Sequence, residues 1–246
     1  NSFSSIGKAV MWGRSLYLNI QRFILFQMTI NVAACIIVLI GAFLGVESPL
    51  TVTQMLWVNL IMDTFAALAL ASLPPSNRVM NDKPRARGAN IITKPMTKGI
   101  FGVGGFFVVL LFGFIQYFKN EDITSLTQFS ITDYFSHFFH FGAPKNGLSA
   151  YELSLFFSIF VFLQFWNMFN AKAYRTGKST FYNIGKSQGF ILIATVIVIG
   201  QVFITTFGGQ MFNVTPLKLT DWAIIIGATS LVLWTGEILR AIKTEK

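Results

Sequence analysis

Six long apolar segments recur along the chain and limit its fold more than any other feature. A helix that crosses the ~30 Å hydrocarbon core of a bilayer needs about 20 residues, and each segment reaches that length. Strands of a membrane barrel would instead form segments of about ten residues with alternating polarity. The sequence therefore predicts an all-α membrane protein, a bundle of six transmembrane helices. The approximate spans are 23–46, 52–73, 97–118, 151–171, 188–207 and 221–240.

Composition supports a membrane protein and argues against a nucleic-acid-binding one. Hydrophobic residues make up 53% of the chain and charged residues only 12%, about half the charged fraction typical of soluble domains. The formal net charge of +9 would favour nucleic acid if the basic residues formed one patch. They lie instead between the apolar segments, where they orient helices in a bilayer. We therefore expect the lipid bilayer as a partner and no nucleic acid.

Lys and Arg alternate in number from one connection to the next. The N-terminal stretch, the 74–98 loop, the 172–187 loop and the C-terminal stretch hold 3, 6, 4 and 3 of them. The other connections hold 0, 2 and 1. Because the excess of Lys and Arg in membrane proteins lies on the cytoplasmic side, this alternation predicts six helices with both termini cytoplasmic.

The first 22 residues differ in pattern from the rest. Ile6, Val10 and Leu16 are separated by polar positions at helical spacing. The pattern predicts an amphipathic helix that continues without a break into the first span, like a stalk. We therefore expect a cytoplasmic stalk helix over 1–22 and a six-helix transmembrane domain over 23–246.

Asp63 is the only acidic residue near the middle of a predicted span. A charge at the centre of a membrane helix costs roughly 2.5–3.5 kcal/mol on insertion scales, and such residues mark ion or proton pathways. Asn59 precedes Asp63 by four residues, so a helix would place both side chains on one face. The pair is typical of an ion-binding site.

Asn31 lies in the first span, one turn after Gln27. A tight hairpin between the first two spans would bring Asn31 to a depth similar to that of Asn59 and Asp63. Converging side-chain oxygens suit a hard cation such as calcium, which takes six to eight oxygen ligands. Asn31, Asn59 and Asp63 are therefore the candidate metal ligands. A proton relay or a structural hydrogen-bond network is the alternative.

Other polar or small residues favour structural roles. Gln164, Asn167 and Asn170 form a stripe that predicts a packing network, with Gln164 as a possible peripheral ligand. His137 and His140 have metal-ligand spacing, but an aromatic-rich interfacial loop explains them better. Glycines in the third span, at 102, 104 and 105, favour close helix packing over phosphate binding. The chain holds no nucleophile–base pair or nucleotide loop, so no ATPase catalytic residue is assigned.

Several stretches together carry a resemblance to a known family. They are Phe3–Ile6, Lys8–Arg14, Phe26–Asn31, Met55–Thr64 and Leu73–Pro75. In these stretches the chain resembles P-type calcium-transporting ATPases, and most of all their plasma-membrane type. The resemblance implies the last six of ten transmembrane helices. It also implies that phosphorylation, nucleotide-binding and actuator domains lie upstream in the same polypeptide, and that ATP and Mg²⁺ act only through them.

The resemblance further implies that Asn59 and Asp63 coordinate calcium, with Asn31 nearby. The two-site pumps of the sarcoplasmic reticulum carry further ligands at three positions, where this chain has Ala34, Met62 and Gln164. The loss of two charges and a hydroxyl predicts a single calcium per cycle. An isolated carboxylate without a cation should take up a proton in a low-dielectric medium, which predicts proton counter-transport.

The expected function is therefore the membrane portion of an ATP-driven calcium export pump. We expect an integral, multi-pass protein of the plasma (cell inner) membrane. Two alternatives stay open at this stage. One is a complete six-helix cation channel or secondary carrier, and the other is a P-type pump for a different cation.

Overall fold

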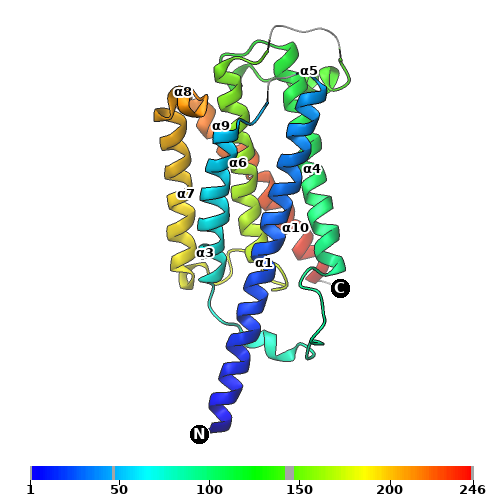
Figure 1. Ribbon diagram of the computed structural model, residues 1–246, viewed down its shortest axis with the longest axis vertical. Coiled ribbons are helices and arrows are strands. Elements are labelled where there is room, and N and C mark those ends of the chain that lie inside the picture. Colours follow the sequence, from blue (N-terminus) through cyan, green and yellow to red (C-terminus); the bar gives the residue numbers. More distant parts are fainter. Residues whose placement is uncertain (1, 46–47, 142–146, 245–246) are drawn as a thin grey trace.

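The computed structural model describes residues 2–45, 48–141 and 147–244 and confirms an all-helical bundle (Figure 1). Glu47, in the first predicted connection, and the side chain of Met62 lie outside the described part. Within that part, six helical segments are long and apolar enough to cross a membrane. They are Ser2–Phe43, Val52–Ala71, Lys94–Asn120, Ala150–Lys172, Gln188–Phe207 and Leu219–Ile242.

Four of the six spans are single helices, and the other two are composite. The single helices are α1 (Ser2–Phe43), α4 (Lys94–Asn120), α6 (Ala150–Lys172) and α7 (Gln188–Phe207). The second span consists of α2 (Val52–Val58), the π-helix η1 (Asn59–Phe65) and α3 (Ala66–Ala71). The last span consists of α9 (Leu219–Thr229) and α10 (Leu231–Thr244). Short helices in the connections are η2 (Asn77–Asn81), η3 (Leu126–Gln128), α5 (Ile131–His137), η4 (Ile184–Lys186) and α8 (Gly209–Phe212).

The α6 helix is the core of the bundle. Within its most apolar window, 89% of the residues are buried, against 44% or less in every other span. It contacts α1, α4, α7, α9 and α10. A capping box starts it, because the Ser149 side chain accepts from the Glu152 backbone while the Glu152 side chain accepts from the Ser149 backbone. The surrounding spans are therefore arranged around a helix whose start is fixed locally.

The stalk region and the first span form one uninterrupted helix of 42 residues. Hydrogen bonds hold the N-terminal half of α1 against the loop that follows the second span. Arg14 Nη1 donates to the carbonyl oxygens of Val79 (3.1 Å) and Asp82 (2.9 Å), and Asn19 Nδ2 donates to that of Leu73 (3.3 Å). The predicted apolar stripe, by contrast, is exposed, with Ile6 at 59%. Polar contacts thus connect the stalk to the rest of the described chain, and Leu18 is the one buried apolar side chain among the described stalk residues.

Most of the basic residues gather at one end of the bundle. The lower part of α1, the 72–93 connection, the 173–187 connection and the end of α10 all lie there (Figure 1). We call it the basic end, defined by these segments. The arrangement agrees with the alternation of Lys and Arg along the sequence. The orientation of this end toward the cytoplasm stays a prediction.

Of the three glycines of the third span predicted to allow close packing, only Gly104 has a neighbour at contact distance, because nothing lies within 4 Å of a Cβ built at Gly102 or Gly105. A Cβ at Gly104 would lie 3.6 Å from the Thr29 carbonyl oxygen of α1, which is ordinary contact distance.

The closest approach occurs instead at Gly113, which the sequence did not single out. A Cβ at Gly113 would overlap the hydroxyl and ring of Tyr134 in α5. Burial raises the pKa of Tyr134 to about 12, so the hydroxyl stays protonated and donates to the Leu110 carbonyl (2.8 Å). Gly113 is therefore required for α5 to pack on α4.

Replacing Gly113 with Ala should destabilise the protein by about 1–3 kcal/mol, the usual effect of overpacking. Gly102 is a matched control on the same helix, because nothing lies within 4 Å of a Cβ built there. Gly102→Ala should leave stability unchanged or raise it by up to about 1 kcal/mol through helix propensity. Thermal melting in detergent measures both changes. Equal melting temperatures for the two variants would contradict the role given to Gly113.

Candidate functional site

The second span is anchored to the bundle along one face. Its start is fixed by a capping box between Thr51 and Gln54. Gln54 Nε2 donates to the Phe212 carbonyl (2.9 Å), and Trp57 Nε1 donates to Gln201 Oε1 of α7 (3.2 Å). Gln54 thus binds the start of the second span to α8, and Trp57 binds it to α7.

The middle of this span departs from α-helical geometry. Residues 59–65 form the π-helix η1, between the α-helical turns of α2 and α3. A π turn bonds residue i to i+5, so it takes in an extra residue and changes which side chains share a face; such turns are frequent at functional sites. Asn59 and Asp63 both lie within η1. The two residues predicted as ligands therefore occupy the irregular part of the span.

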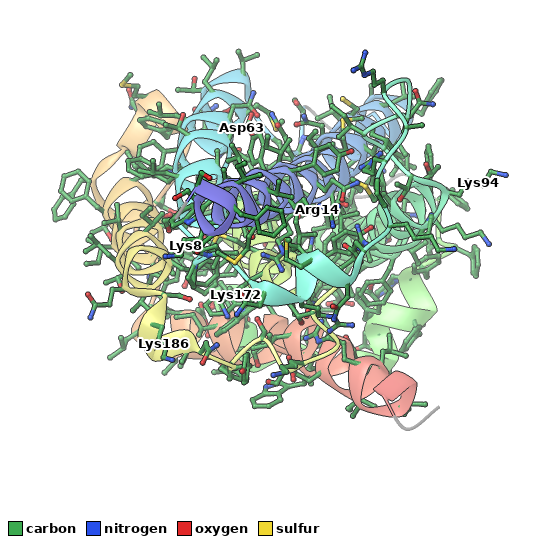
Figure 2. All side chains as sticks on the ribbon, turned by 90° about the horizontal axis from the view of Figure 1, so that it is seen from below. Lys8, Arg14, Asp63, Lys94, Lys172 and Lys186 are labelled. Carbon is green, nitrogen blue, oxygen red and sulfur yellow. The ribbon has the colours of Figure 1, made fainter. Side chains whose placement is uncertain are left out.

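Asp63 has an incompletely satisfied carboxylate. Its Oδ1 atom is buried and has no hydrogen-bond partner in the described structure. The Gln27 side chain of α1 lies beside the Asp63 carboxyl group. No Lys or Arg among the described residues forms an ion pair with it. Figure 2, seen along the bundle, shows Asp63 on the second span beside α1.

Asn59 and Asn31 differ in their surroundings. Asn59 is exposed, whereas Asn31 and Asp63 are half-buried. Within the described chain, no hydrogen bond joins any two of these three side chains. Gln27, four residues before Asn31 and therefore on the same face of α1, is the residue that contacts Asp63. Sequence reasoning named Gln27 only as a neighbour of Asn31 and missed it as a partner of the carboxylate.

The side chains named so far carry enough oxygen atoms for part of a hard-cation site. Asp63 offers two oxygens, and the amides of Asn31, Asn59 and Gln27 offer one each. That total is at most five, below the six to eight that calcium takes, so further ligands are needed for a complete shell. The exposure of Asn59 leaves a face of the second span on which such ligands can approach. Cation binding by these residues stays a prediction.

None of the other polar residues singled out in the sequence belongs to an ion site in the described structure. They either make contacts that support packing or, like Gln164, make no hydrogen bond there. Asn170 of the α6 stripe donates to the Val232 carbonyl (2.9 Å) and accepts from Arg240 (3.0 Å), as expected for a packing network. Gln164 is fully buried, yet neither polar atom of its amide has a hydrogen-bond partner in the described structure. His137 pairs with Glu121 (2.9 Å) rather than joining a metal cluster. Among the described residues, no group of three His, Cys, Asp or Glu side chains could hold a metal.

The fold and the site together define a multi-pass helical membrane protein with a carboxylate in its second span. Over residues 47–242 the chain matches the family described as "Cation transporting ATPase, C-terminus". The chain belongs to this family of C-terminal regions of cation-transporting ATPases.

Three curated relatives show how far the similarity extends. Plasma membrane calcium-transporting ATPase 2 of Oreochromis mossambicus is 36% identical over 248 residues, which is 100% of this chain and 21% of the relative. Plasma membrane calcium-transporting ATPase 4 of Homo sapiens is 36% identical over 249 residues, 99% of this chain and 19% of the relative. Plasma membrane calcium-transporting ATPase 1 of Gallus gallus is 34% identical over 248 residues, 100% of this chain and 19% of the relative. The chain thus spans about a fifth of the length of the curated relatives that it matches.

Proposed function

We propose that this chain is the membrane portion of an ATP-driven calcium export pump of the plasma membrane. The observation that carries the proposal is the Asp63 carboxylate. It lies in a π turn of a membrane span, with one oxygen unpartnered and no basic side chain paired with it in the described structure. Such a group is costly unless a cation or proton neutralises it periodically. The names of the relatives favour calcium as that cation.

In this proposal Asp63, Asn59 and Asn31 supply part of a single calcium site, with Gln27 positioning the carboxylate. The remaining oxygens and all groups that use ATP and Mg²⁺ come from upstream domains of the same polypeptide. A single site is supported by the apolar side chain of Ala34 and by Gln164, whose amide brings no charge. When calcium leaves, Asp63 takes one proton, so the site returns with a proton in place of the calcium ion.

Phosphorylation upstream reaches the site through α1. Because the stalk and the first span are one helix, a displacement of residues near Ser2 is carried to Gln27 without an intervening hinge. The same helix carries Asn31 four residues further on. A shift of α1 would therefore move Gln27 and Asn31 together relative to Asp63 and release the ion.

Reconstitution of the full-length protein into sealed vesicles tests the function. We expect ATP to drive the uptake of radioactive calcium into vesicles whose outer face corresponds to the basic end. Micromolar calcium should stimulate ATP hydrolysis in the absence of other transported cations, and the vesicle lumen should lose protons as calcium enters. Stimulation by another cation but not by calcium would identify a pump for that ion. Calcium uptake that needs no ATP would identify a channel or carrier.

A further inference from the structure

The second span lies between two helices that differ in their connections to the rest of the bundle. It packs on α1 on one side and on α7 on the other (Figure 1). The α1 helix extends into the stalk, whereas α7 packs on the central helix α6. At that contact the ring centroids of Phe190 and Phe169 lie 5.0 Å apart, with the rings at 90°. The α7 helix therefore connects the second span to the core of the bundle.

A chain of polar side chains joins α7 to the second span just before the π turn. Trp57 Nε1 donates to Gln201 Oε1 (3.2 Å), and Gln201 Nε2 donates to Thr205 Oγ1 (3.2 Å). Gln201 and Thr205 are fully buried. Both polar atoms of the Gln201 amide are thus used, and the bond to Thr205 leaves the amide oxygen to accept from Trp57. An amide inside a membrane span is costly unless it is paired in this way.

The backbone of α7 also approaches the π turn itself. A Cβ at Gly200 would lie 3.2 Å from Ile61 Cδ1 and 3.4 Å from Trp57 Cζ2. Ile61 is buried and lies in η1, between Asn59 and Asp63 along the chain. The residue between the two predicted ligands therefore rests directly against α7.

Another close contact follows the π turn. A Cβ at Gly189 of α7 would lie 2.8 Å from Ser72 Oγ, at the end of α3. The α7 helix thus contacts the second span before η1, at η1 and after η1. Because a π turn is rare inside an α-helix, the position of its side chains depends on how the flanking α-helical turns are held. Here α7 holds the turns on both sides.

We propose that Gln201 is a positioning residue for the calcium site. Through Trp57 it fixes the rotation of the second span at η1, and so it directs Asn59 and Asp63 toward the other ligands. Gln201 is not itself a ligand. This role rests on the proposed function and adds a fixed reference to it. When α1 moves, Asp63 stays in place against α7, so the site changes shape.

A purely structural role of the contact would give a different result. If the hydrogen bond between Trp57 and Gln201 only stabilised the bundle, its loss would lower the melting temperature and leave the calcium affinity of the folded protein unchanged. A positioning role predicts weaker calcium binding in protein that still folds and still reaches full phosphorylation at saturating calcium.

The calcium dependence of phosphorylation by ATP in the full-length protein tests the proposal. Gln201→Met keeps the length of the side chain but removes the acceptor, and Trp57→Phe removes the donor. Each should raise the calcium concentration for half-maximal phosphorylation about fivefold, equivalent to about 1 kcal/mol for one hydrogen bond. The maximal phosphorylation should stay unchanged. The double variant should show the same shift as either single variant, because both changes remove one contact.

Two more variants make the test specific. Gln188→Met is the matched control, because it makes the same change at an exposed position of the same helix. It should respond to calcium like the unaltered protein. Gly200→Ala keeps the hydrogen bond but places a methyl group against Ile61. It should also weaken the calcium response, and it tests the contact if Gln201→Met is too unstable to purify.

Three outcomes would overturn the proposal. A lower melting temperature with an unchanged calcium response in Gln201→Met and Trp57→Phe would make the contact purely structural. Additive shifts in the double variant would show that the two residues act separately. An equal shift in Gln188→Met would indicate a general effect of changes in α7. An unaltered protein without any calcium dependence is a separate result, because it would contradict the proposed function and this role with it.

Discussion

Replacing Asp63 with Asn in the full-length protein should abolish calcium-dependent phosphorylation by ATP. Asn keeps the size of the side chain and one oxygen but removes the only acidic charge near the middle of a span. Removing one partner of a buried charge pair costs about 3–5 kcal/mol. That cost corresponds to a loss of calcium affinity of at least about 100-fold. Phosphoenzyme formation measured against free calcium concentration gives the result directly.

Two further variants distinguish a loss of calcium binding at the site from general damage to the protein. Gln27→Leu removes the contact that α1 makes with the carboxylate but keeps the charge. It should weaken calcium dependence about 10-fold, because the charged carboxylate loses a polar neighbour. Asp133→Asn makes the same chemical change as Asp63→Asn, but in α5, outside the spans, and should have no effect. Full calcium dependence in Asp63→Asn would refute the ligand assignment while leaving calcium transport itself intact.

The six spans could be predicted because apolar length is a property of the sequence. Predicted 188–207 coincides with α7, and predicted 151–171 differs from α6 by one residue at each end. The break in the last span, at Ser230, could not be predicted. Apolar residues continue across it, so the sequence pattern does not mark the interruption.

The candidate site was predictable in its residues but not in its geometry. An intramembrane carboxylate is visible in any sequence, so Asp63 could be found. The π turn could not, because residues 59–65 have the same apolar pattern whether they bond to i+4 or to i+5, and packing decides between the two. The contact between Gln27 and Asp63 depends on the rotation of α1 against the second span. Spacing along α1 made Gln27 and Asn31 equivalent, and only tertiary structure distinguishes them.

A second large effect is expected at Asp221, a fully buried carboxylate in the first turn of α9. Its Oδ1 accepts from the Ser125 hydroxyl (2.7 Å) and from the Leu126 backbone N–H (2.9 Å). Its Oδ2 accepts a short hydrogen bond from the Tyr151 hydroxyl. One side chain thus joins η3, the start of α6 and the start of the last span, at the end of the bundle opposite the basic end (Figure 1).

Asp221→Ala should therefore prevent most of the protein from folding. The change leaves two buried donors, the Ser125 hydroxyl and the Leu126 N–H, and the half-buried Tyr151 hydroxyl without their acceptor, and each unsatisfied buried donor costs about 1–3 kcal/mol. Their sum approaches the whole stability of a typical protein, about 5–15 kcal/mol. The measurements are the yield of monodisperse protein in size-exclusion chromatography and its melting temperature. Asp133→Ala, which removes a half-exposed carboxylate, is the control and should melt like the unaltered protein.

Asp221→Asn distinguishes the loss of charge from the loss of hydrogen bonds. The Asn oxygen can still accept from Ser125 and Leu126, and the Tyr151 hydroxyl can turn to accept from the new amide. We therefore expect a melting temperature between those of Asp221→Ala and the unaltered protein, with calcium dependence retained, because Asp63 lies on a different span. If Asn destabilises as much as Ala, the negative charge itself holds the three segments together. If Ala melts like the unaltered protein, the network contributes nothing and α6 alone organises that end of the bundle.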